Sequence, residues 1–136
     1  PCGGGCTLTI GYWKTHAGFH GNNPDRVTQY LPIWLGTGSG ESIHVTGAEQ
    51  AMNILSMKLG HSSNGITKLY AQLLGAKLNI ANGADGAAVA VTIAAADDFL
   101  EDHDWTDWDS LSRAEKRRVL RWMSTLDDYN NASAWC

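Results

Sequence analysis

Serine and histidine occur together in the segment GHSSNG (60–65), which is close to the GxSxG motif of serine hydrolases. Its second glycine comes one position too late, at Gly65, and the motif needs a strand before its serine. The preceding residues repeat with a helical period instead, and no Ser-His-Asp arrangement is visible. The sequence therefore does not predict a serine hydrolase.

A pair of histidines near the N-terminus has a spacing that suits a metal site. His16 and His20 stand four residues apart, which places both on one face if the segment is helical. A carboxylate from Asp127 or Asp128 would complete a set of ligands for zinc or copper. The two glycines within 14–21 oppose a stable helix there, so these four residues are weak metal candidates.

The favoured alternative for His16 is a structural one, in which the ring is hydrogen-bonded within an aromatic cluster that contains Tyr12 and Trp13. A bare pair of histidines is a weak signature of a metal site. We therefore predict that the chain holds no tight structural metal and no cofactor.

The acidic segment EDHDWTDWD (101–109) offers oxygen ligands for calcium. An EF-hand loop that starts at Asp102 would need glycine at its sixth position and glutamate at its twelfth, where this chain has Asp107 and Arg113. The segment is therefore not an EF-hand. A calcium site of another kind stays open here, because calcium accepts varied arrangements of oxygen ligands.

Two of the six tryptophans, Trp105 and Trp108, lie among these acids and are predicted to be partly exposed. Exposed indole rings stack on sugars and are common at interfaces. They are candidate ligand-binding residues, with a surface polysaccharide as a candidate partner. The other four are expected in the core: Trp13, Trp34, Trp122 and Trp135.

Acidic and basic residues are segregated along the chain. Seven acids and no base lie between 97 and 109, and five bases with one acid lie between 113 and 121. Such runs are commonly solvated surfaces; the alternative is contact between two copies, acid against base. The residues of that predicted contact are Asp102, Asp104, Asp107, Arg113, Arg117 and Arg121. The net charge of −4 argues against a nucleic-acid partner.

Helical spacing of apolar residues predicts four main helices, near 47–58, 65–82, 86–101 and 112–130. Capping boxes at Thr46 and Ser112 would begin the first and the last of them, and Asn82-Gly83 would end the second. The alanine-rich third helix is apolar on nearly every face, which favours a place at the bundle centre.

The segment 32–45 reads as two short strands around a Gly/Ser turn. The predicted fold is mainly α, an antiparallel bundle of about four helices with a small β-hairpin and an irregular, glycine-rich N-terminal arm. A chain of 136 residues is expected to form a single domain, 1–136, with residues 1–5 as the arm. No stretch approaches the ~20 apolar residues of a membrane span, so no membrane insertion is expected.

The three cysteines lie only at the two ends of the chain, at Cys2, Cys6 and Cys136. This placement makes sense if the ends meet, as domain termini often do. A disulfide between the ends would close nearly the whole chain into one loop and would imply an oxidising compartment.

The sequences GCTLTIGYWKTH, AKLNIANGAD and STLDDYNN, with the terminal cysteine, resemble a module of secreted and cell-surface bacterial proteins. Members typically read GCTLTQGYWKTH near the start and LDDYNN followed by a cysteine at the end. The likeness spans residues 5–136, although Tyr70-Ala71-Gln72 stands where members often have Ala-His-Gln. It implies an extracellular location and a disulfide from Cys6 to Cys136, and it implies no activity.

Cys2 is then left over, and an intermolecular bond is a plausible use for it. If all copies are equivalent, Cys2 can pair only with another Cys2 across a two-fold axis.

We expect an extracellular, non-enzymatic structural module that self-associates as a homo-oligomer or polymer, such as a filament or surface-layer subunit. The alternative is a secreted module that binds carbohydrate or metal.

Overall fold

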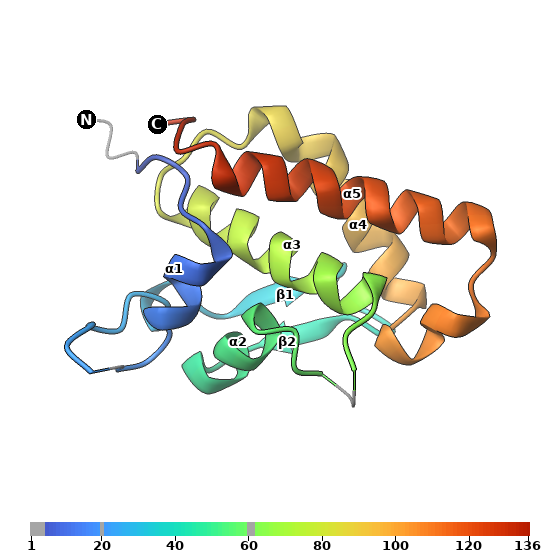
Figure 1. The fold of residues 1–136 in the computed structure, drawn as a ribbon, viewed down its shortest axis with the longest axis horizontal. Coiled ribbons are helices and arrows are strands. Elements are labelled where there is room, and N and C mark those ends of the chain that lie inside the picture. The colour runs from blue at the N-terminus through green and yellow to red at the C-terminus, as the bar shows by residue number, and fades with distance from the viewer. Residues whose placement is uncertain (1–4, 20, 60–61) are drawn as a thin grey trace.

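The computed structural model describes residues 5–19, 21–59 and 62–136 (Figure 1). The α-helices among them are α1 (Ile10–Thr15), α2 (Ala48–Leu55), α3 (Gly65–Ala81), α4 (Ala90–Asp102) and α5 (Arg113–Asn131). The strands are β1 (Ile33–Leu35) and β2 (Ile43–Val45), and the 3-10 turns are η1 (Thr28–Tyr30), η2 (Ala87–Val89) and η3 (Trp105–Ser110). The prediction of a mainly helical fold with a small hairpin is confirmed.

The centre of the molecule is α3, in which 13 of 17 residues are buried. It contacts α5, α2, α1, β1 and η3, and Figure 1 shows it running beneath α5 and over the hairpin. The prediction that the alanine-rich helix lies at the centre is wrong. In α4 the buried residues are Ala96, Phe99 and Leu100, while Val91 is 84% exposed. Alanine gains little from burial, so the larger leucine and isoleucine side chains of α3 take the centre.

Local capping explains several helix ends. The predicted box at α5 is present: the Glu115 amide donates to Ser112 Oγ (3.1 Å) and the Ser112 amide donates to Glu115 Oε1 (2.9 Å). Gly83, at φ +102°, follows the end of α3 as predicted. The predicted box at Thr46 is wrong, because α2 begins after Gly47 without a side-chain cap, and the Thr46 amide donates to Gln50 Oε1 instead.

The short helix α1 lies in a segment whose sequence predicts irregular structure. Its first turn is capped by Thr9, whose Oγ1 accepts a hydrogen bond from the Tyr12 amide (3.0 Å). Trp13 in its middle is fully buried. A helix of six residues is marginal by itself, so tertiary packing of this indole stabilises it.

The hairpin pairs β1 with β2 in antiparallel register, with Trp34 opposite His44. These two rings stack on the outer face, 4.1 Å apart and nearly parallel. Trp34 is 39% exposed and Trp135 is 43% exposed, so the expectation of a core position is wrong for both. Among the described helices, none is both long and apolar enough to cross a membrane.

Gly65, the first residue of α3, lies directly against the Trp108 ring, and a Cβ at this position would overlap the indole. We expect Gly65→Ala to lower the free energy of unfolding by about 1–3 kcal/mol, as overpacking does. Gly11→Ala is the control, because its Cβ would meet only Thr9 Oγ1 at 3.6 Å and alanine favours the helix. Equal urea midpoints for the two variants would contradict the tight Gly65–Trp108 contact.

Candidate functional site

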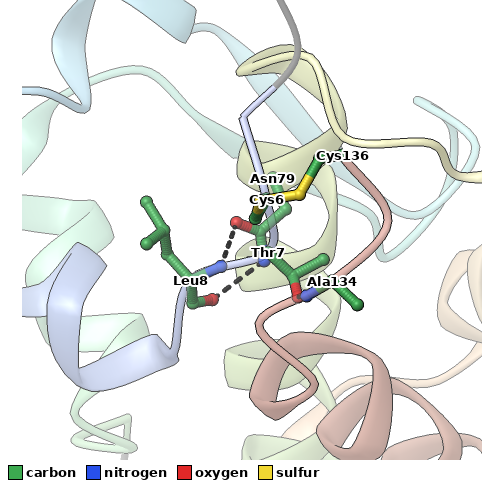
Figure 2. Close-up of a disulfide and its surroundings, with 6 residues drawn as sticks. All are labelled: Cys6, Thr7, Leu8, Asn79, Ala134 and Cys136. Atoms are coloured by element: carbon green, nitrogen blue, oxygen red, sulfur yellow. Dashed lines mark hydrogen bonds between the residues drawn. A yellow bond between two sulfur atoms is a disulfide. The ribbon is translucent and has the colours of Figure 1, made fainter.

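A disulfide and backbone hydrogen bonds hold the two ends of the described chain together (Figure 2). Cys6 is bonded to Cys136, a sequence separation of 130. Beside this bond the Thr7 amide donates to the Ala134 carbonyl (2.8 Å), and the Ala134 amide donates to Thr7 Oγ1 (3.3 Å). The pairing that the resemblance implied is therefore present.

Asn79, fully buried near the end of α3, binds the N-terminal segment to the helices. Its Oδ1 accepts hydrogen bonds from the Leu8 amide (2.8 Å) and Trp13 Nε1 (3.1 Å). Its Nδ2 donates to the Leu8 carbonyl (2.9 Å) and to Asn130 Oδ1 (3.0 Å). Both donors and both acceptor positions of this amide are used. The Asn79 side chain on α3 is therefore bonded both to the segment around α1 and to α5.

The hydrogen-bond network continues from Asn79 into α5. Asn130 Nδ2 donates to the carbonyl and to Oε1 of Gln72, at 3.0 and 2.9 Å. Gln72 Nε2 donates to Asp127 Oδ1 (3.1 Å), which also accepts from Asn131 Nδ2 (2.6 Å). Polar residues of the motifs NIANG and LDDYNN, which carry the resemblance, are thus engaged in structural hydrogen bonds. Sequence reasoning missed this network, because the bonds of Asn79 with Leu8 and of Asn130 with Asn79 and Gln72 join residues 51 to 71 positions apart.

His16 lies in the aromatic cluster that the sequence favoured. Its ring stacks on Tyr12, with centroids 4.0 Å apart, and its Nδ1 lies 2.7 Å from the Tyr12 carbonyl. Tyr12 in turn meets the edge of Trp13. The hydrogen bond to the carbonyl requires a proton on Nδ1, and the ring therefore closes the C-terminal turn of α1.

The weak metal candidates are placed in different surroundings. Asp127 belongs to the amide network, Asp128 is exposed on α5, and His20 lies outside the described residues. Within 5–19, 21–59 and 62–136, no group of three or more His, Cys, Asp or Glu side chains is arranged to hold a metal ion.

Trp105 and Trp108 in η3 are half-buried against the core, in keeping with the predicted partial exposure. The Trp105 carbonyl accepts a hydrogen bond from Asn64 Nδ2 (2.9 Å). The Trp108 ring covers Gly65 on one side, and the Lys116 ammonium lies 5.4 Å from its centroid. Both rings thus take part in packing. Sugar binding by these two rings stays a prediction.

The predicted acidic contact residues have unequal surroundings. Asp104 caps η3 through its bond to the Thr106 amide (2.9 Å), and Asp107 Oδ2 accepts from the Asp104 amide (2.9 Å). Asp107 also lies 3.9 Å from His103 Nδ1. Asp102, at the end of α4, is exposed. The acidic surface that faces solvent is therefore smaller than the sequence indicated.

The predicted basic contact residues form an exposed row on α5. Arg113, Arg117 and Arg121 follow one another at intervals of four and all three are exposed. No acidic side chain in the described part of the chain forms a salt bridge with any of them. Glu115, between them in sequence, binds Ser112, and those hydrogen bonds, with His103 nearby, lower its pKa.

A cleft beside α1 and α2 was not foreseen from the sequence. It is lined by Lys14, Thr15, Asn23, Met52, Ser56 and Lys58. Its two ammonium groups come from residues 44 positions apart, so no local pattern signals their convergence. Ammonium, hydroxyl and amide groups together would suit an anionic ligand.

No family model, no curated protein and no solved structure matches this chain.

Proposed function

We propose that this chain is an extracellular, non-enzymatic structural module that self-associates, as the subunit of a filament or surface layer. The observation that carries the proposal is the exposed row Arg113, Arg117 and Arg121, which lacks salt bridges to the described acids although seven acids lie just before it in sequence. Exposed charge that is unpaired within one copy is available to steer and orient a second copy.

The hydrogen bonds of the buried amide side chains support a structural role. Asn79, Asn130 and Gln72 bind one another and the backbone in the interior, so their chemistry is spent on holding the fold. The Cys6–Cys136 disulfide suits an oxidising, extracellular compartment. A domain closed at its ends in this way resists unfolding outside the cell.

The acids that complement the arginine row are the exposed ones, Asp98, Asp102 and Asp109. Asp104 and Asp107, which the sequence also placed in this contact, are engaged within their own copy. Opposite charges on α4 and α5 allow the same molecule to offer both halves of a contact, which is what a repeating assembly needs.

Reversing two charges of the row should weaken association. We expect Arg117→Glu with Arg121→Glu to raise the dissociation constant at low salt by about tenfold or more, because attraction becomes repulsion and exposed pairs are least screened there. Sedimentation velocity over a range of protein and salt concentrations measures this.

The matched control is Lys58→Glu with Lys68→Glu. It changes the net charge by the same amount as the arginine variant, at two exposed positions, one in the loop after α2 and one on α3. An equal loss of association in this control would show a general charge effect and contradict the arginine contact. A wild-type chain that stays monomeric at high concentration and low salt would contradict self-association itself.

Cys2 is the remaining part of the proposal, and it lies outside the described residues. With Cys6 and Cys136 bonded to each other, an intermolecular bond between equivalent copies must join Cys2 to Cys2. Non-reducing electrophoresis should then show a dimer that Cys2→Ser abolishes, and a monomer in both chains would remove Cys2 from the contact.

A further inference from the structure

An apolar groove lies where η2 meets the C-terminal end of α5. Its lining includes Ala88 and Val89 of η2, Tyr129 of α5, and Ala132 and Trp135 of the C-terminal segment. The volume of the groove is about 220 Å³, which is below the ~300 Å³ at which small-molecule pockets begin. The groove therefore suits protruding side chains of another protein surface better than a bound small molecule.

Trp135 forms a wall of this groove and is held there by its neighbours. Its carbonyl accepts a hydrogen bond from the Asp85 amide (2.6 Å), and its ring stacks on Tyr129 with centroids 6.1 Å apart. The φ of Trp135 is +62°, in the left-handed region that a bulky residue rarely adopts. The indole is nevertheless 43% exposed. Backbone strain of this kind is concentrated at functional sites, so this exposed ring points to a contact surface.

The first turns of α4 extend the apolar surface beyond the groove. Val91, one helical turn after Ala88, is 84% exposed, and Ala87, Ala90 and Ala94 are exposed as well. Clustered exposed apolar side chains commonly mark an interaction site. The apolar pattern that predicted a central helix is thus left uncovered at the surface of a single copy.

The N-terminal segment enters the domain beside this groove. Cys6 is bonded to Cys136, the residue after Trp135 (Figure 2). One residue earlier, the Gly5 amide donates to the Asn82 carbonyl (3.1 Å). The chain before Gly5 therefore starts close to the exposed indole.

The position of Cys2 in the sequence indicates which molecule covers the groove. Cys2 lies outside the described residues and three positions before Gly5, so it is within about 11 Å of Gly5 even in an extended chain. With Cys6 and Cys136 bonded to each other, Cys2 of equivalent copies can pair only across a two-fold axis. Such an axis has to pass near the groove.

We propose that the groove and the exposed face of α4 form a two-fold contact between two copies of this chain, with Val91 of each copy packed against the groove of the other. A two-fold contact uses the same surface twice and must be self-complementary; here a hollow and a protruding apolar side chain lie next to each other. The inference rests on the proposed self-association and adds a second contact, separate from the arginine row.

Sedimentation velocity of the Cys2→Ser chain, with the other disulfide intact, tests the contact without the help of a covalent bond. In about 0.5 M NaCl exposed ion pairs are largely screened, and we expect a dimer to persist. Val91→Glu should raise its dissociation constant by about tenfold or more, because a charge would be buried in an apolar contact. The control is Phe19→Glu, which makes the same charge change at an equally exposed position, 83% against 84%, and should change the constant by less than about twofold.

Oxidation of the chain that retains Cys2 gives a second readout. The disulfide-linked dimer should form more slowly in Val91→Glu than in Phe19→Glu. If wild type associates at low salt but Val91→Glu associates as strongly as Phe19→Glu, the two-fold contact is wrong and self-association through the arginine row stands. Loss of association in the arginine variant, with the high-salt dimer retained, would support two separate contacts. A wild-type chain that is monomeric at every salt concentration would overturn both proposals.

Discussion

Replacing Asn79 with alanine is expected to lower the free energy of unfolding by about 4 kcal/mol. The substitution removes the partners of both backbone groups of Leu8, of Trp13 Nε1 and of Asn130 Oδ1. Alanine cannot replace any of these bonds, and the site is closed to water because Asn79 is fully buried. Urea or guanidinium denaturation, followed by tryptophan fluorescence, measures the change in midpoint and slope.

Asn131→Ala is the matched control for this experiment. Asn131 makes the same kind of hydrogen bond, but its side chain is exposed and its partner Asp127 lies one turn away in α5. Its loss should cost at most about 0.5–1 kcal/mol. If the two variants are destabilised equally, the buried network contributes no more than a surface bond, and its role in joining the chain end to the bundle is wrong.

Removing the disulfide by Cys6→Ser with Cys136→Ser is expected to cost about 5 kcal/mol. Most of the chain lies between the two cysteines, at a separation of 130, so the bond restricts the unfolded chain over nearly its whole length. The chain-entropy relation gives about 5 kcal/mol for a loop of this size. Denaturation of the oxidised wild type and of the double variant measures the difference.

Two controls make the disulfide result specific. A reducing agent should lower the stability of wild type to that of the double variant and should not change the variant itself. Peptide mapping under non-reducing conditions should recover Cys6 joined to Cys136; recovery of Cys2 joined to Cys6 would contradict the structure. A loss well below 1 kcal/mol would show that the hydrogen bonds of Thr7 with Ala134 hold the ends without the covalent bond.

Features that depend on neighbouring residues could be predicted from the sequence. The Ser112–Glu115 capping box, the end of α3 at Asn82-Gly83 and the hairpin strands are each encoded within a few positions. Hydrophobic spacing likewise located the four long helical segments. The cap at Thr46 was wrong because Gln50 bound the Thr46 amide, a competing local bond that the capping pattern does not distinguish.

Which helix lies at the centre of the molecule depends on the tertiary structure. An alanine-rich helix and a leucine-rich helix both have apolar patterns, and which of them is central depends on the total area that all neighbours can bury. That area favours α3 over α4. Trp34 was misplaced for a related reason: alternation predicts two faces for a strand, but only packing decides which one the hairpin turns to the core.

Local sequence patterns specify the type and approximate limits of the main elements, because backbone hydrogen bonding and capping act within one or two turns. Which polar groups meet depends on how the elements pack together. Asn79 reaches Leu8 across 71 positions, and the Glu41 amide reaches the Glu101 carbonyl because the hairpin loop lies on the end of α4. Side chains far apart in sequence come within bonding distance only when the packed core fixes their elements, so a pattern of neighbours cannot show them.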